Sequence, residues 1–413
     1  MEQNKKSTIV AYIYTVFVAA SMSRLFGLGS LIAPHVYFND LQYMILLFVS
    51  IVFIIIQILF VDKLRIRKME QYRSLWYFFM ILIAVEMFSS VLQYGSSGRM
   101  ILKDAMYYYT PMLSYYCFYS MSFKTEIVEV IKKVIVISAL LVTIVSIIEY
   151  VFLLRGNDIL QLGTSISVRY GSPRYNLASI LYILGFLISF GQSLEENREF
   201  RIFNKYGFIS IIILFNLIFV AKGRSLVVYL LIASCIALIV SRKISRGFKS
   251  LLIVMVVLLV AGLAIFKLPT VIATLTNTDA GVAIRIDEVK YYFNQITMHP
   301  LLGMGFVPST SNLTSGPYGM YYQSDVGLLG VVNKFGLLML VWIICWFVRS
   351  VMLLARGNYY MRTGIISIML LTYLFISNVS LSFLDYNKTM IIPIAMILFE
   401  NQIRYRGQKD AAK

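Results

Sequence analysis

The sequence has few charged residues. Only 14% of its 413 residues are Asp, Glu, Lys or Arg, whereas 59% are hydrophobic; soluble domains carry about 25% charged residues. Water cannot solvate such a chain as a globule, so the composition predicts a lipid bilayer as its solvent. The net charge of +17 is then better explained by basic loops and an anionic ligand than by nucleic acid.

Cysteine, histidine and catalytic motifs are scarce as well. The three cysteines lie in apolar runs, without metal-ligand spacing or a disulfide framework. There is no HExxH motif, no P-loop, no Asp-x-Asp motif and no Cys/His cluster. We therefore expect no metal and no cofactor. We find no internal repeat, which argues against a secondary transporter.

Long apolar runs are what the sequence has in abundance. They predict an all-α, polytopic transmembrane bundle of about 12 spans, forming a single integral membrane domain over residues 1–413. The first run is interpreted as a retained span, and the seventh and eighth could instead form one re-entrant hairpin. The predicted spans are 7–23, 41–61, 75–94, 105–122, 134–154, 177–194, 206–221, 225–241, 251–267, 325–348, 363–384 and 389–403.

The basic residues predict the orientation in the membrane. Most of the 37 lysines and arginines fall in connections that would share one side with both termini, and the positive-inside rule makes that side cytoplasmic. Two longer connections then lie outside, at about 155–176 and 268–324. The second contains an apolar stripe at helical spacing, which predicts an amphipathic helix on the membrane surface, able to cap a site. The stripe consists of Ile286, Val289, Tyr292, Phe293 and Ile296.

Four arginines lie on the predicted outer side, where positive charge is disfavoured. Arg169 and Arg174 share one loop, Arg224 belongs to the tight turn Lys222–Ser225, and Arg285 opens the loop helix. A guanidinium group binds phosphate through two parallel hydrogen bonds, so these residues are candidates for a lipid pyrophosphate site. The alternatives are arginines that bind lipid headgroups, and a plain turn whose glycine permits a positive φ.

Further candidates flank the last part of the long loop. His299 could move a proton or fix a turn, and Asp325 could accept a proton from a sugar hydroxyl. Alternatively, either Ser324 or Asp325 could cap the next helix. Tyr321 and Tyr322 offer rings on which sugars could stack.

Three ionisable residues lie inside predicted spans. These are Glu86, Glu149 and Lys334, and we expect them to face the interior of the bundle. Either glutamate is a candidate partner for Lys334.

Four pieces of the sequence together resemble the O-antigen polymerase and O-antigen ligase-like family, which includes polymerases of capsular and exopolysaccharide systems. They are the loop with Arg169 and Arg174, the Gly-Arg-Ser turn at Arg224, Arg285 followed by His299-Pro-Leu-Leu-Gly-Met-Gly305, and Ser324-Asp325-Val-Gly327 before a span containing Gly336. The topology matches over the whole chain, and the motifs match over about its second half.

The resemblance implies a metal-independent glycosyltransferase of the bacterial plasma membrane. Its donor would be an oligosaccharide on undecaprenyl pyrophosphate, its acceptor another lipid-linked repeat, and its active site would face outward. Arg169, Arg174, Arg224 and Arg285 would hold the pyrophosphate, and Asp325, or else His299, would accept the proton. The family's ligases carry a His-Asn pair where this chain has Ser324-Asp325, which favours a polymerase. A chain-length regulator is the expected protein partner.

Two other classes remain open. A flippase for the lipid-linked repeat would share the basic residues and the many spans, and a ligase-like glycosyltransferase would use a different acceptor. The lipid-linked species that accumulates in a deletion strain would separate a flippase from a polymerase, and the identity of the acceptor would separate a ligase.

Overall fold

The protein is mostly helical in the part of the chain that its computed structural model describes. The description covers residues 2–23, 38–60, 71–95, 97–122, 126–159, 166–169, 172–196, 204–241, 280–307, 311–317, 321–357, 364–378, 381–386 and 388–411, with the single positions 247, 250 and 319. The predicted span at 251–267 lies outside these residues.

The helices follow the apolar runs closely. They are α1 (Glu2–Ser21), α3 (Phe38–Phe60), α4 (Arg73–Tyr94), α5 (Gly98–Met121), α6 (Ile127–Leu154), α7 (Ser179–Glu196), α8 (Lys205–Phe215), the π-helix η3 (Asn216–Val220), α9 (Arg224–Val240), α11 (Ala280–Met298), α12 (Asn312–Ser315), the 3₁₀-helix η4 (Gln323–Val326), α13 (Leu328–Arg356), α14 (Gly364–Ser377) and α15 (Ile391–Ala411).

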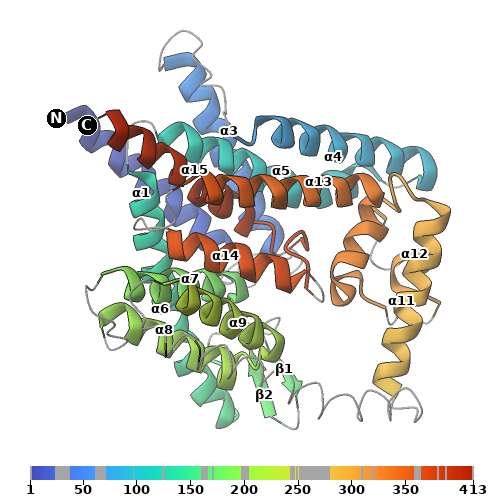
Figure 1. The fold of residues 1–413 in the computed structure, drawn as a ribbon. Helices are drawn as coiled ribbons and strands as arrows, with labels where there is room; N and C mark the ends of the chain where they lie inside the picture. Colours follow the sequence, from blue (N-terminus) through green and yellow to red (C-terminus); the bar gives the residue numbers. More distant parts are fainter. Residues whose placement is uncertain are drawn as a thin grey trace.

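Three of these helices, α4, α6 and α13, are long and apolar enough to cross a membrane. Shorter apolar helices account for most of the other predicted spans. The start of α1 and the end of α15 lie on the same side of the molecule (Figure 1). The coarse prediction of a helical protein with membrane-spanning segments therefore fits the fold, whereas the number of spans and their orientation stay predictions.

A small β-hairpin departs from the all-α prediction. Strands β1 (Ile166–Arg169) and β2 (Ser172–Tyr175) pair antiparallel, and Ser167 lies opposite Arg174. Two short runs containing β-branched and aromatic residues, separated by a connection with Gly171, are the usual sequence signal for such a hairpin. The prediction of an outer loop at 155–176 does not include these strands.

Helix α13 is interrupted near its start. Gly336 has φ 70° and ψ −173°, which is not helical, and such a backbone conformation is essentially restricted to glycine. Figure 1 shows the short first part of α13 beside α11 and the long second part turning away beside α4. Lys334 therefore lies at a corner of the chain rather than within a continuous span.

The turn after α11 occupies this interruption. Main-chain N–H groups of Met304 and Gly305 donate to the carbonyl oxygens of Asn333 (2.9 Å) and Lys334 (2.7 Å), and Leu337 N–H donates to the carbonyl of Pro300 (2.8 Å). The turn thus replaces the helical hydrogen bonds that the break removes, as a nonpolar environment requires.

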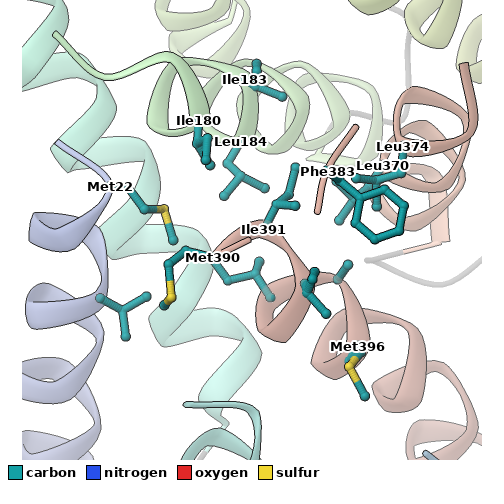
Figure 2. Packing of buried hydrophobic residues seen from close by; sticks show 14 of the residues in the cluster. Met22, Ile180, Ile183, Leu184, Leu370, Leu374, Phe383, Met390, Ile391 and Met396 are labelled. Carbon is teal, nitrogen blue, oxygen red and sulfur yellow. The ribbon is translucent and has the colours of Figure 1, made fainter. Parts of the chain in front are cut away.

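The core joins segments that are far apart in the sequence. Figure 2 shows Ile180 and Leu184 of α7 facing Met390 and Ile391 at the start of α15, and all four side chains are buried. Leu328 N–H, at the start of α13, donates to the carbonyl of Asn378 after α14 (2.8 Å). The segment between α14 and α15 is therefore held beside the starts of α7 and α13.

Candidate functional site

The hairpin and the Lys222–Arg224 turn are joined by two reciprocal hydrogen bonds. Arg174 donates from Nε to the carbonyl of Ala221 (2.8 Å), and Lys222 donates from Nζ to the carbonyl of Pro173 (2.7 Å). The Lys222 ammonium also lies 5.7 Å from the ring centre of Tyr150 on α6, within cation–π range. Two of the predicted basic segments, far apart in the sequence, therefore form one basic junction.

Lys222 has a strained backbone. Its φ is 47°, and it is the one non-glycine with positive φ within the described ranges, whereas Gly223 has φ −86°. The alternative interpretation, a plain turn whose glycine has positive φ, therefore does not describe this turn. The Lys222 side chain is held by its hydrogen bond to Pro173 and by its contact with Tyr150. These two contacts keep the residue in a backbone conformation that lysine disfavours. Such strain is concentrated at functional sites.

The backbone gives the positions of Arg169 and Arg224 relative to the junction. The hairpin register puts positions 167 and 169 on the face shared with position 174, and residue 224 is the first residue of α9. Acidic residues also approach this region, because Glu149 and Asp158 both act electrostatically on Tyr175. The junction therefore carries charges of both signs.

A buried carboxylate on α11 fixes the segment that precedes α13. Glu288 is 3% exposed, and its Oε1 accepts a hydrogen bond from the main-chain N–H of Tyr322, 2.6 Å away. Hydrogen bonds to an ionised carboxylate are stronger than neutral ones. Because Arg285 lies one turn before Glu288, this contact connects the helix of Arg285 to the turn of Asp325. Sequence reasoning missed Glu288, since its spacing does not distinguish it from other polar residues.

Further buried amides extend this connection. Gln323 donates to Asn333 Oδ1 (2.6 Å), Asn333 donates to Gln295 Oε1 (2.8 Å), and Gln295 donates to the carbonyl of Leu313 (2.8 Å). A buried polar network whose members satisfy one another favours one arrangement of the surrounding elements. This Glu288–Asn333 network therefore holds α11, α12, η4 and the start of α13 as one unit.

The predicted apolar stripe of α11 is divided between two environments. Tyr292 and Ile296 are buried, whereas Val289 and Phe293 are exposed, Phe293 to 58%. The side chain of Ile286 lies outside the described part. Glu288 and Gln295 share the buried face because the protein supplies hydrogen-bond partners for them. The helix itself is confirmed, and its place on a membrane surface stays a prediction.

The candidate proton acceptors lie at the two ends of this unit. The carbonyl of His299 accepts from Gly303 N–H (3.0 Å), so the backbone of His299 helps to form the turn that fills the α13 break. Asp325 lies in η4. The residue at the N-cap of α13 is Gly327, with no side-chain hydrogen bond, so neither Ser324 nor Asp325 takes the capping position. The side chains of Asp325, Arg169, Arg224 and Arg285 lie outside the described part.

The two tyrosines have different surroundings. Tyr321 is 7% exposed and packs against Tyr291, with ring centres 5.4 Å apart, whereas Tyr322 is 63% exposed. Burial raises the pKa of the Tyr291 hydroxyl, and the nearby Tyr321 raises it further. Tyr291 therefore stays protonated and donates to the carbonyl of Asn312 (2.7 Å). Of the two proposed stacking residues, Tyr322 has the accessible ring.

The intramembrane acids separate into two environments. Glu86 and Glu149 are both buried, as expected. Lys334 lies about 5 Å from each of three aromatic ring centres, and Glu86 is among the acids that act on it electrostatically. Glu149 accepts a hydrogen bond from Ile159 N–H (2.9 Å). Of the two glutamates, only Glu86 is among the groups that act on Lys334, after Asp104 and Asp385, and its carboxyl group makes no hydrogen bond with described residues.

The structure thus gathers the predicted residues into two groups, the basic junction and the unit of α11, η4 and α13. Together with the three helices that are long and apolar enough to cross a membrane, they define a helical chain with polar groups gathered at helix ends. No protein-family model matches the sequence, and no curated protein matches it either.

Proposed function

We propose that the protein is a polysaccharide polymerase of the bacterial plasma membrane. It transfers an oligosaccharide from undecaprenyl pyrophosphate to another lipid-linked repeat unit on the outer face. In this proposal the chain crosses the bilayer about 12 times, both termini are cytoplasmic, and the long loops are outside. A chain-length regulator is the expected protein partner.

The basic junction carries the proposal. Arg174 and Lys222 come from segments separated by α7 and α8, yet each donates to the backbone of the other's segment. A strained lysine in a turn between two apolar helices costs free energy, and such costs are most often retained where they serve a ligand. A pyrophosphate joined to a polyprenyl chain fits cations beside apolar helices, because its head is anionic and its tail is not.

The residues have separate roles in the proposed reaction. A hydroxyl oxygen of the acceptor attacks the anomeric carbon of the donor, and the bond from that carbon to the pyrophosphate oxygen breaks. The hydroxyl proton passes to Asp325, or else to His299. Undecaprenyl pyrophosphate leaves with the bonding electron pair, and the cations of the junction, with Arg285, stabilise its growing negative charge.

The first test is the polymer that cells make. A deletion strain complemented with Arg224→Ala or Arg285→Ala should contain normal amounts of the protein but surface glycan of a single repeat unit, seen on gels. Arg73→Ala is the matched control, because Arg73 is also an arginine at the start of a helix but belongs to α4, where it lies beside Tyr77. Normal long polymer from both test variants would refute the roles assigned to these arginines.

One observation favours a flippase as the second candidate. The interrupted helix α13 is a feature that many transporters use at their substrate site. The location of the accumulated lipid-linked repeat in the deletion strain decides between the two. A polymerase defect leaves the repeat accessible to an external glycosidase, whereas a flippase defect leaves it protected until the membrane is opened.

A further inference from the structure

A second polar cluster lies at the ends of α5 and α13 and in the segment between α14 and α15. Asp385 and Lys388 form an ion pair of 3.0 Å, and both side chains are mostly buried. Asp104, Asp385 and Tyr386 all act electrostatically on Lys334. We call these five residues, Asp104, Lys334, Asp385, Tyr386 and Lys388, the Asp385 cluster. The proposed reaction leaves it without a role.

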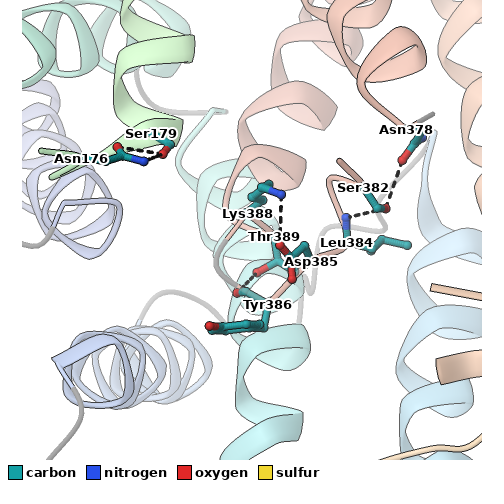
Figure 3. A network of polar contacts seen from close by, with 9 residues as sticks. All are labelled: Asn176, Ser179, Asn378, Ser382, Leu384, Asp385, Tyr386, Lys388 and Thr389. Carbon is teal, nitrogen blue, oxygen red and sulfur yellow. Dashed lines mark hydrogen bonds and ion pairs between the residues drawn. The ribbon is translucent and has the colours of Figure 1, made fainter. Parts of the chain in front are cut away.

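The cluster combines an accessible ring with a rigid support. Tyr386 is 44% exposed, and its ring packs edge-on against Tyr107, with the centres 5.3 Å apart. Figure 3 shows Lys388 bonded to Asp385, and the Thr389 hydroxyl bonded to the carbonyl of Tyr386, within one short segment. Thr389 also donates to the carbonyl of Tyr107 on α5 (2.7 Å). The backbone that presents Tyr386 is therefore held in place before any ligand arrives.

The charges of the cluster select a class of ligand. Two carboxylates would repel a phosphate, and two ammonium groups would repel a metal cation. Sugar hydroxyls both donate and accept hydrogen bonds, so a neutral pyranose can use carboxylates and ammonium groups at the same time. A tyrosine ring beside them suits the apolar face of a sugar. The basic junction, in contrast, suits the pyrophosphate.

A buried carboxylate extends the cluster inward. Glu86 is fully buried, its two oxygens make no hydrogen bond with described residues, and it acts electrostatically on Lys334 from α4. A buried carboxyl group without a hydrogen-bond partner among the described residues is costly, and Glu86 places such a polar group beside Lys334.

The cluster also lies beside the helix that follows the hairpin. Figure 2 shows the start of α7 packing against Met390 and Ile391, directly after Lys388. Asn176, between β2 and α7, bonds to Ser179, and Figure 3 shows this pair apart from Asp385 and Lys388. The helix that follows the hairpin and the segment that follows Asp385 therefore pack against each other.

We propose that the Asp385 cluster is a carbohydrate-binding subsite that holds the sugar of the acceptor. This inference rests on the proposed function and deepens it, because it assigns separate places to the pyrophosphate of the donor and the glycan of the acceptor. Asp385 and Lys388 bind hydroxyls, and Tyr386 supplies the stacking face.

Binding to purified protein tests the subsite without requiring turnover. The probes are oligosaccharides released by mild acid from the surface polysaccharide of the parent strain, and inorganic pyrophosphate, both measured by calorimetry in detergent. Tyr386→Ala and Asp385→Asn should each weaken oligosaccharide binding at least about tenfold, the size expected for a lost contact of this kind. Both should leave pyrophosphate binding unchanged, and Tyr386→Phe should retain oligosaccharide binding.

The control variant is Tyr206→Ala. Tyr206 lies beside a lysine, Lys205, at the start of α8, so the same change is made near a similar charge elsewhere. All variants should elute as wild type on gel filtration. If Tyr386→Ala does not elute as wild type, the binding measurement with Asp385→Asn, which conserves side-chain size, tests the subsite. Wild-type protein that fails to bind the oligosaccharide, or variants that bind it as wild type does, would overturn the subsite.

The two proposals fail in different ways. A deletion strain without long polymer, together with purified protein that does not bind the oligosaccharide, rejects the subsite and keeps the polymerase. Normal polymer in the deletion strain rejects the polymerase. Tyr386-dependent binding of oligosaccharide would then still support a carbohydrate site at this cluster.

Discussion

Substitution of Gly336 by alanine tests the interruption of α13. A Cβ atom at residue 336 would overlap the main-chain carbonyl of Leu301, which belongs to the turn that fills the break. The backbone conformation itself, with φ 70° and ψ −173°, costs a residue with a side chain about 1–3 kcal/mol. The variant must therefore change both its own backbone and the turn opposite it.

The magnitude follows from these two changes. Moving the turn would weaken the hydrogen bonds from Gly305 and Leu337 that cross the break, each worth about 0.5–1.5 kcal/mol. Together with the backbone term, we expect a loss of about 2–6 kcal/mol in the free energy of unfolding.

Gly95→Ala is the matched control. Gly95 also has positive φ, at 58°, but nothing lies within 4 Å of the Cβ position. It should lose only about 1–2 kcal/mol. Unfolding in mixed micelles of mild detergent and dodecyl sulfate, followed by tryptophan fluorescence, measures both. Equal losses for the two variants would show that the turn does not fill the break tightly, and the reasoning would be wrong.

Three further predictions concern the site. Glu288→Ala should lower the rate of chain growth about ten- to hundredfold, mainly through kcat, because it releases the Tyr322 N–H and the turn of Asp325. Glu288→Gln keeps a hydrogen-bond acceptor and should restore most of the rate. A membrane assay with lipid-linked repeat measures both variants. Lys222→Met should lower stability by about 1 kcal/mol, because its bond to Pro173 is lost, and should raise the KM for lipid-linked donor; an unchanged KM would remove Lys222 from the site. Single cysteines are introduced at Leu313 and at Lys205 in a chain without Cys117, Cys235 and Cys345. The cysteine at 313 should react with an impermeant maleimide in intact cells, whereas the cysteine at 205 should react only after lysis. The reverse pattern would place the long loop in the cytosol.

Much of the helical framework could be predicted because lipid solvation leaves few choices. Apolar runs of sufficient length form helices, since a backbone in hydrocarbon must satisfy its own hydrogen bonds. The end of α4 was predicted at its observed residue, Tyr94. The prediction for the next-to-last span was less accurate, because α14 ends at Ser377 although apolar residues continue beyond it. Apolar composition alone does not mark where a helix gives way to a turn.

The candidate site was harder to predict, because its contacts are made by the backbone. The reciprocal bonds of Arg174 and Lys222 end on carbonyl oxygens, which every residue has, so side-chain types do not reveal them. Glu288 was missed for the same reason, since its partner is a main-chain N–H. The positive φ of Lys222 contradicts the local preference for Gly223. The hairpin, in contrast, had a readable signal in Gly171 between two strand-like runs.

The filled break in α13 has a consequence for biosynthesis. The ribosome makes residues 299–305 before residues 328–356, so the segment that completes the helix is already present when the helix enters the bilayer. A chain cut between Val307 and Tyr321 would separate the two, and the C-terminal fragment alone would expose unsatisfied carbonyls at Asn333 and Lys334 to lipid, at a cost of several kcal/mol. In the proposed placement across the bilayer, insertion of this region therefore depends on continuity of the chain across the loop.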